Sequence, residues 1–200
     1  MQKFIICLLV LLVLGCGSDK VKIQGDTEWQ LQQNALFKDA TRSPLTDADR
    51  KDFKGLDFFE YRESFKVMAK LIRTPGTPYV KMKTTTDEVN EERVYGTVEF
   101  QFEGQSFSLN VYQSKDAMST PGFENYLFLP FFDKTNGDES YGGGRYLDLR
   151  IPNGDSIEID FNKAYNPYCV YNERYSCPLV PRVNFIDFEV KAGMKNYEKK

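Results

Sequence analysis

From residue 65 onward the chain alternates apolar and polar residues with the period of two that is typical of β-strands. Short polar segments separate the alternating runs, and no segment with a helical period lies between them. The pattern therefore predicts a mainly β fold, either an antiparallel β-sandwich or a partly closed β-barrel. The alternating runs cover residues 65–71, 94–102, 107–111, 147–151, 157–161 and 186–190.

Two of these runs, residues 94–102 and 107–111, meet at Gly104 and predict a β-hairpin. Residues 126–132 differ because they form a nearly continuous apolar run. This run contains Pro130, which has no backbone N–H for a ladder hydrogen bond and therefore favours an edge strand or a bulge.

Two short helices are predicted before the first strand. Asp26 is a suitable N-cap for a helix that carries Trp29, Leu36 and Phe37 on one side. The sequence TDAD resembles a capping box and predicts a second helix over about residues 47–54.

The beginning of the chain has the pattern of an export signal. Lys3 supplies a positive charge, and residues 4–14 form an apolar run that is too short to span a bilayer but suits the core of a signal peptide. The run ends in VLGC, which resembles the lipobox of bacterial lipoproteins, where the cysteine is lipidated and becomes the first residue. Cys16 is therefore the predicted lipidation site, and residues 1–15 are the predicted signal peptide.

The predicted mature protein has two parts: the lipidated cysteine with a polar tether (residues 16–25) and a single domain (residues 26–200). Acyl chains on Cys16 would anchor it to a membrane of the bacterial cell envelope. Because Gly17 rather than an aspartate follows the cysteine, we expect the outer membrane.

Composition narrows the available chemistry. The chain is 41% hydrophobic and 14% aromatic, which suits a globular domain with a core. The net charge is −3 without a long basic run, so nucleic acid is not an expected partner. The sequence has no histidine, which excludes the usual catalytic triads and HExxH zinc sites. No cofactor and no metal site are expected.

The alternating runs on either side of residues 153–155 predict a second hairpin. If their apolar faces pair, Leu149 lies opposite Ile159. Asp148 and Asp160 would then face each other on the other side of the hairpin, although like charges in that position repel. Two close carboxylates need a cation, an arginine or a shared proton, so the pair is a candidate acid/base or cation site. The alternatives are that both carboxylates are solvated, or that the register differs by one residue.

The segment NKAYNPYCVYNERYSCP, residues 162–178, is the most unusual part of the chain. It holds four of the twelve tyrosines and two of the four cysteines. Residues 162–182 show no sustained period, and a structureless loop of about twenty residues inside a domain is usually functional or disordered. In an oxidising compartment we expect a disulfide between Cys169 and Cys177, with free thiols or a catalytic cysteine as alternatives.

The block FLPFFDKTNGDESYGGGRYLDL and the segment IDFNKAYNPYCVYNERYSCPLVP resemble a bacterial family called domain of unknown function 1684. The segments SPLTDADRKDFKGLDFF and YGTVEFQFEGQSFSLNVY resemble earlier parts of the same family. The resemblance covers about residues 40–193 and implies no activity, because the family is uncharacterised. After the second cysteine the family usually has two adjacent prolines and then an acidic residue before an asparagine. This chain departs from that pattern, because it has Val180 and Val183 there.

These features together predict a non-catalytic binding protein whose partner is a small polar ligand or an envelope protein. The alternative is an envelope hydrolase that uses Asp148 and Asp160, or a thiol. A third interpretation is that the same polar side chains only hold a difficult loop in place. The candidate ligand-binding residues are Arg145, Asp148, Asp160, Asn162, Tyr165, Asn166, Tyr171 and Asn184.

Overall fold

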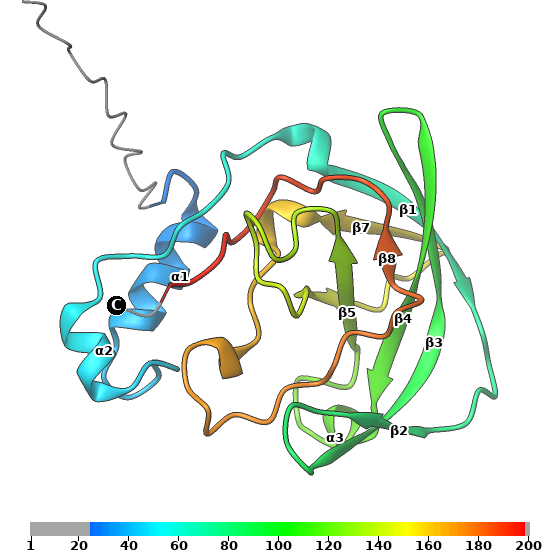
Figure 1. The fold of residues 1–200 in the computed structure, drawn as a ribbon. Coiled ribbons are helices and arrows are strands. Elements are labelled where there is room, and N and C mark those ends of the chain that lie inside the picture. The colour runs from blue at the N-terminus through cyan, green and yellow to red at the C-terminus, as the bar shows by residue number, and fades with distance from the viewer. Residues whose placement is uncertain (1–24, 199–200) are drawn as a thin grey trace, which may run out of the picture.

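The computed structural model describes residues 25–198, in which a curled, mainly antiparallel sheet forms half of a barrel (Figure 1). The strands follow the order β6-β5-β4-β3-β1-β7, while β2 pairs with β3 and β8 pairs in parallel with β5. The predicted mainly β fold, as a partly closed barrel with short N-terminal helices, is therefore confirmed. The strands are β1 (Lys66–Arg73), β2 (Val80–Lys83), β3 (Val89–Phe102), β4 (Gln105–Ser114), β5 (Tyr126–Asp133), β6 (Arg145–Arg150), β7 (Ser156–Asp160) and β8 (Phe185–Ile186).

The α-helices are short and lie at one side of the sheet or at its lower edge (Figure 1). They are α1 (Glu28–Lys38), α2 (Asp47–Asp52) and α3 (Lys115–Met118). The N-cap of α1 is Thr27 and not Asp26, because Thr27 and Gln30 form a complete capping box. The second helix starts as predicted, with the Thr46 side chain accepting a hydrogen bond from the Asp49 backbone N–H.

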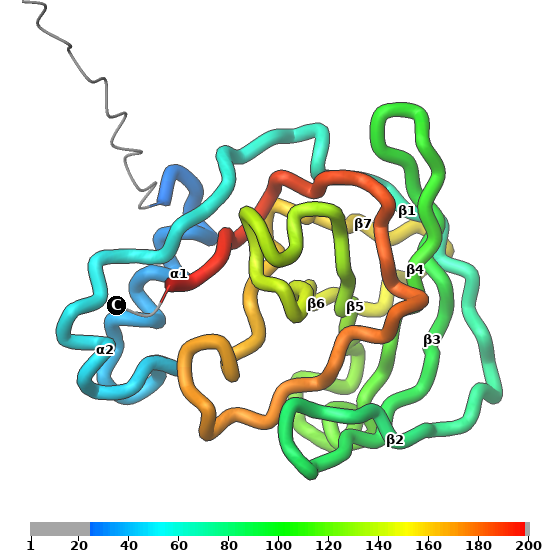
Figure 2. The backbone as a smooth tube through the Cα atoms, in the orientation of Figure 1, coloured from blue at the N-terminus to red at the C-terminus, as the bar shows by residue number. Residues whose placement is uncertain are grey.

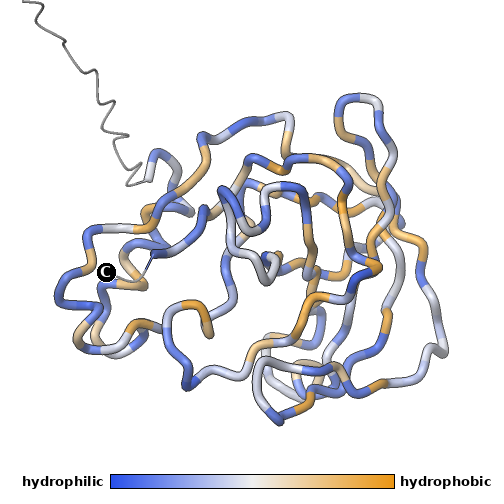
Figure 3. The backbone as a smooth tube through the Cα atoms, viewed as in Figure 1, coloured by the Kyte–Doolittle hydropathy of each residue, from blue (hydrophilic) through white to orange (hydrophobic). Residues whose placement is uncertain are grey.

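The sheet is covered on both faces in the region of β4, β5 and β6. Leu127, Leu129 and Phe131 of β5 point into the largest apolar cluster of the domain, inside the curl of the sheet. Tyr126 and Phe128 point to the other face and pack in a separate cluster. This two-sided burial explains why residues 126–132 are almost continuously apolar, and hydrophobic stretches follow the strands in Figure 3.

A bulge in β3 changes which side chains reach each face. Val94 stands opposite Tyr112 and Gly96 stands opposite Val111, so Tyr95 has no partner on β4. Since the extra residue reverses the alternation, Val94 lies on the face of Tyr112 and away from the main core.

The predicted hairpin between β6 and β7 is wrong. β6 pairs with β5, with Asp148 opposite Phe128, whereas β7 pairs with β1, with Asp160 opposite Lys66. The two strands are therefore the two ends of the curled sheet, and residues 151–155 connect them. β6 and β7 both alternate apolar and polar residues, so the pattern alone would allow them to pair with each other. In the structure β5 is the backbone partner of β6, and β1 is the backbone partner of β7.

Pro130 does not lie in an edge strand, since β5 is flanked by β4 and β6. It lies where β4 and β5 separate, because the two strands share one paired position, Tyr112 opposite Phe128. Asn184 occupies the space beside it and donates hydrogen bonds from Nδ2 to the carbonyl oxygens of Pro130 (2.7 Å) and Asn110 (2.8 Å). A proline is tolerated here because no ladder hydrogen bond is required of its nitrogen.

Candidate functional site

A pocket of about 660 Å³ lies between α1 and the face of the sheet that carries Tyr126 and Phe128. Its floor is made by residues of β3, β4, β5 and β6, and most of them are aromatic or acidic. The main floor residues are Glu92, Ser114, Tyr126, Phe128, Tyr146 and Asp148.

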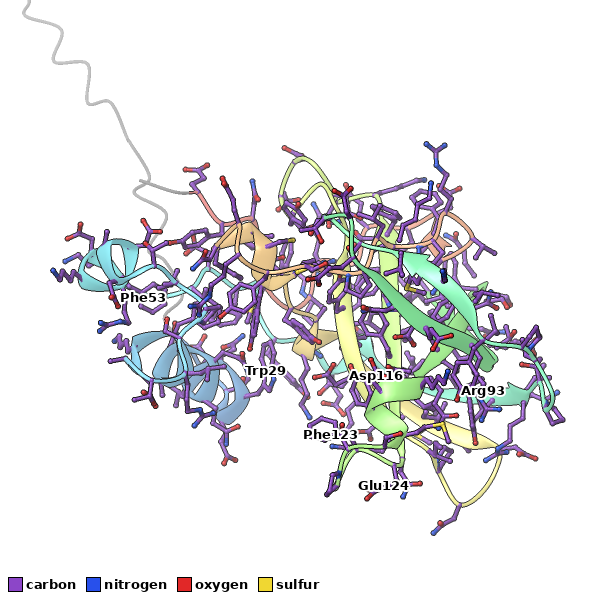
Figure 4. All side chains as sticks on the ribbon, turned by 90° about the horizontal axis from the view of Figure 1, so that it is seen from below. Trp29, Phe53, Arg93, Asp116, Phe123 and Glu124 are labelled. Atoms are coloured by element: carbon purple, nitrogen blue, oxygen red, sulfur yellow. The ribbon has the colours of Figure 1, made fainter. Side chains whose placement is uncertain are left out.

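The walls of the pocket come from three segments that are distant in sequence. Trp29 and Leu36 belong to α1, and Phe123 belongs to the segment after α3 (Figure 4). The third wall is the tyrosine-rich loop, residues 162–178, which runs in orange between the helices and the strands in Figure 2. This loop contributes Lys163, Tyr165, Asn166, Tyr168, Tyr175, Ser176, Cys177 and Pro178.

Asp148 is fixed at the floor by two tyrosines. The hydroxyls of Tyr126 and Tyr165 both donate to its Oδ1, at 2.8 Å and 2.6 Å. Burial, strengthened by the nearby Asp148 carboxylate, raises the pKa of each tyrosine above its usual value. Both phenols therefore stay protonated at neutral pH and hold the carboxylate in one orientation.

Glu92 is the second carboxyl group of the pocket, and sequence reasoning missed it. Its side chain is only 3% exposed, and within residues 25–198 its Oε2 has no hydrogen-bond partner. Burial raises the pKa of this carboxyl group to about 7, against a smaller lowering by the hydrogen bond from Ser114. The bulge at Tyr95 places Glu92 on the pocket face, whereas an uninterrupted alternation with Val98 and Phe100 would have placed it in the core.

The two loop cysteines lie side by side, and Cys177 lines the pocket. The backbone N–H of Cys169 donates to Sγ of Cys177 at 3.1 Å, and both side chains are thiols in this structure. A hydrogen bond from the Cys177 thiol lowers the pKa of Cys169 to about 6. The geometry is compatible with the expected disulfide, which stays a prediction.

Of the eight candidate ligand-binding residues, Asp148, Tyr165 and Asn166 line the pocket. Nδ2 of Asn166 donates to the Lys195 carbonyl oxygen at 2.8 Å, and its buried Oδ1 has no partner among the described residues. The other five lie elsewhere and make contacts that hold the chain together: Arg145, Asp160, Asn162, Tyr171 and Asn184.

Arg145 is fully buried on the core side of β6. Its Nη2 forms an ion pair with Oδ2 of Asp133 at 2.8 Å and also donates to the Val190 carbonyl oxygen at 2.8 Å. Its Nη1 donates to the carbonyl oxygens of Ala192 and Met194. These contacts attach the C-terminal segment to the sheet, so the guanidinium group has no access to the pocket.

Asp160, Asn162 and Tyr171 also bind neighbouring chain segments. Asp160 accepts hydrogen bonds from Asn162. The side-chain amide of Asn162 also accepts a hydrogen bond from the backbone N–H of Arg62 and donates one to its carbonyl oxygen. Tyr171 is buried against Phe37 of α1, with ring centroids 4.7 Å apart. Asp148 and Asp160 thus have different partners, and only Asp148 faces the pocket.

Within residues 25–198, no group of three or more Cys, Asp or Glu side chains is arranged to hold a metal ion. The same part of the chain contains no helix with the length and hydrophobicity that a membrane span needs. Cys16 and the predicted signal peptide lie outside the described residues.

Comparison with known proteins identifies the family. The profile of the family described as "Protein of unknown function (DUF1684)" matches residues 51–195, and the chain belongs to this family. An uncharacterised protein from gene locus rrnAC0354 of Haloarcula marismortui, solved by solution NMR, is 32% identical, with a TM-score of 0.64. That match covers 82% of this chain and 88% of the other. No curated protein matches the chain.

Proposed function

We propose that the protein is a lipid-anchored binding protein of the bacterial cell envelope, held at the outer membrane, and that its pocket takes a small ligand with an apolar body and polar groups. The apolar run that ends at Cys16 supports the anchor. The pocket supports ligand binding, because its volume of about 660 Å³ is that of a small-molecule site.

The observation that carries this proposal is the composition of the pocket. Aromatic side chains from α1, β5, β6 and the tyrosine-rich loop surround a few fixed polar groups, of which Asp148 is held by two hydroxyls. Apolar walls with a small number of oriented polar groups are typical of specific ligand sites.

The test is a thermal-shift screen of a small-molecule library with a blocked pocket as the comparison. Thr120 is an exposed lining residue, so Thr120→Trp should fill the pocket mouth without disturbing the core. Ser119→Trp is the matched control, because Ser119 is an exposed neighbour that does not line the pocket. Compounds that stabilise the wild type and Ser119→Trp, but not Thr120→Trp, support the proposal. A library without such compounds contradicts it.

A second candidate function is acid/base hydrolysis, which one observation favours. Glu92 and Asp148 line the same pocket, and the pKa of Glu92 is raised to about 7, so this carboxyl group can give or take a proton near neutral pH. Hydrolysis of chromogenic glycosides or esters by the wild type, lost in both Glu92→Gln and Asp148→Asn, would support this function. Activity that survives in both variants would show that these two carboxyl groups are not the acid and base of the hydrolysis.

A further inference from the structure

We infer that the ligand of this pocket is an organic cation, whose charged nitrogen binds at the carboxyl group of Glu92 while its apolar part packs on the surrounding aromatic rings. This inference rests on the proposed binding function and specifies its ligand class. It follows from three properties of the pocket: the sign of its charges, an unsatisfied buried oxygen and the arrangement of its ring faces.

The charged groups of the pocket favour a positive ligand. Its lining contains three charged side chains, Glu92, Asp148 and Lys163. The Lys163 ammonium is half exposed and lies 3.5 Å from Oδ2 of Asp160, a residue that does not line the pocket. In the described part of the chain, no ion pair involves Glu92 or Asp148, so neither carboxyl group is in direct contact with a cation of the protein.

The hydrogen bonding of these two groups points to a donor on the ligand. Buried polar atoms in folded proteins are nearly always hydrogen-bonded, and Oε2 of Glu92 has no partner among the described residues. Asp148 receives both tyrosine hydroxyls on Oδ1, and no hydrogen bond within residues 25–198 reaches its Oδ2. A ligand N–H group can satisfy either oxygen, whereas a ligand carboxylate or phosphate would be repelled by Asp148 and, above about pH 7, also by ionised Glu92.

The aromatic walls provide the surface that an organic cation prefers. Ring faces attract ammonium and guanidinium groups through the quadrupole of the π-system. Phe123 and Tyr126 already do so in this structure, because the guanidinium carbon of Arg150 lies 5.3 Å and 5.8 Å from their ring centroids. Arg174 lies over Tyr175 in the same way, 4.7 Å from the ring centroid, whereas the lining rings of Trp29, Tyr165 and Tyr168 have no cation–π partner in the described chain.

Protonation of Glu92 makes the inferred binding depend on pH. Ser114 donates a hydrogen bond to Glu92, Asp116 contributes a negative charge, and Tyr112 and Tyr126 stay neutral because burial raises the pKa of both phenols. Since the pKa of Glu92 is about 7, this group is mostly neutral at lower pH and mostly anionic at higher pH. The affinity for a cation should therefore rise about tenfold from about pH 6 to about pH 8.

The experiment compares three probes that share a phenyl group: phenethylamine as the cation, 2-phenylethanol as the neutral compound and phenylacetate as the anion. Dissociation constants are measured by calorimetry on protein purified with its own N-terminus, in the same detergent throughout. The proteins are the wild type, Glu92→Gln, Thr120→Trp and Glu91→Gln. Glu91 is the matched control because it precedes Glu92, is exposed and pairs with Lys115 at 2.7 Å outside the pocket.

The expected result is that the amine binds the wild type at least about tenfold more tightly than the alcohol, with the anion weakest. Glu92→Gln should remove most of the preference for the amine over the alcohol, together with its pH dependence. Glu91→Gln should behave as the wild type, and Thr120→Trp should bind none of the probes.

Equal binding of amine and alcohol, or a preference for phenylacetate, would overturn the cation assignment while the binding function stands. The same conclusion follows if no probe binds but library compounds still stabilise the protein in a way that Thr120→Trp abolishes. If neither the probes nor the library bind, the proposed binding function itself fails.

Discussion

Glu92 is a carboxyl group in a position that opposes its ionisation. It is almost fully buried on β3, and no basic side chain among residues 25–198 lowers its pKa. A buried acid of this kind is rarely favourable for folding, because the charged form loses its hydration. Stability therefore does not explain the residue, whereas its place in the pocket lining supports the ligand-binding role inferred above.

Glu92 should make the free energy of unfolding depend on pH. Its pKa is about 7 in the folded protein and near 4.5 without the fold, so the folded protein holds this proton more tightly. The stabilisation is therefore complete below about pH 4.5 and is lost as the pH rises towards 7 and above, by roughly 3 kcal/mol. Urea unfolding at about pH 5 and pH 8 should show this loss in the wild type and not in Glu92→Gln.

The control for this measurement is again Glu91→Gln, which removes an exposed carboxylate from the same strand. It should change the difference between the two pH values by less than about 0.5 kcal/mol, since exposed ion pairs contribute little. An unchanged pH dependence in Glu92→Gln would mean that Glu92 is not the titrating group.

The cysteine pair should be oxidised in the exported protein. Cys169 and Cys177 are in hydrogen-bonding contact, and the low pKa of Cys169 favours the thiolate that starts disulfide formation. Alkylation of protein isolated from the envelope should leave both residues unlabelled, whereas reduction should allow two labels, as read by the mass of the peptide that contains them. Two labels before reduction would show free thiols and would favour a thiol function for the loop.

Single positions of the pocket were only partly predictable from the sequence. Asp148 and Tyr165 were found because one lies in an alternating strand and the other in an unusually tyrosine-rich loop. Arg145 was placed with them, although it shares the parity of Leu147 and Leu149 and therefore points to the core. Glu92 could not be predicted as a pocket residue. The bulge at Tyr95 determines which face of the sheet its side chain lies on, and no residue pattern indicates that bulge.

At the scale of elements, Asn184 replaces hydrogen bonds that the sheet lacks. β4 and β5 separate beyond the pair of Tyr112 and Phe128, and the Asn184 amide fills the gap. Its Nδ2 donates to the carbonyl oxygens of Asn110 and Pro130, and its Oδ1 accepts from the Asn110 N–H at 2.9 Å. One side chain thus satisfies three backbone groups of two neighbouring strands.

Asn184→Ala should lower the free energy of unfolding by about 3 kcal/mol or more, because it leaves three partly or fully buried backbone groups without partners. Chemical denaturation gives the value directly. Asn153→Ala is the matched control, since Asn153 lies exposed in the connection between β6 and β7 and should change stability by less than about 0.5 kcal/mol. A loss of less than 1 kcal/mol in Asn184→Ala would show that water replaces the amide.

The elements themselves were more predictable than their partners. Periodicity located the β3–β4 hairpin correctly, because a two-residue turn at Glu103-Gly104 leaves adjacent strands no other arrangement. It failed for β6 and β7, where the five residues 151–155 are long enough to lead to the far end of a curled sheet. Alternation defines the faces of a strand, and it does not define which strand lies beside it.

At the scale of the whole molecule, the pocket depends on parts that fold against each other over long sequence distances. The sheet supplies the floor, the tyrosine-rich loop a wall, and α1 another wall that packs on the loop through Phe37 and Tyr171. The family match starts at residue 51, after α1. The α1 wall, with Trp29 and Leu36, is thus the part of the pocket that lies outside the matched region.

The predicted anchor would place this pocket close to a membrane. Thr27, the N-cap of α1, follows Cys16 by eleven residues, so even a fully extended chain would keep α1 within about 40 Å of the lipid. Because Trp29 in the first turn of α1 lines the pocket, this edge of the ligand site would lie at a similar distance from the lipid. A site at that distance suits a ligand that is delivered or released at the membrane surface.

Two cysteine variants test the anchor. Cys16→Ser removes the predicted acyl attachment site, so the protein should move from the membrane pellet to the soluble fraction after cell fractionation, and its mass should lack the added lipid. Cys7→Ser is the matched control, because Cys7 lies in the predicted signal peptide and its replacement should leave the mature protein in the membrane. If Cys16→Ser stays in the membrane fraction, lipidation does not hold the protein there. If it is released and binds the same ligands, the pocket functions independently of the anchor, which then serves only to set where binding takes place.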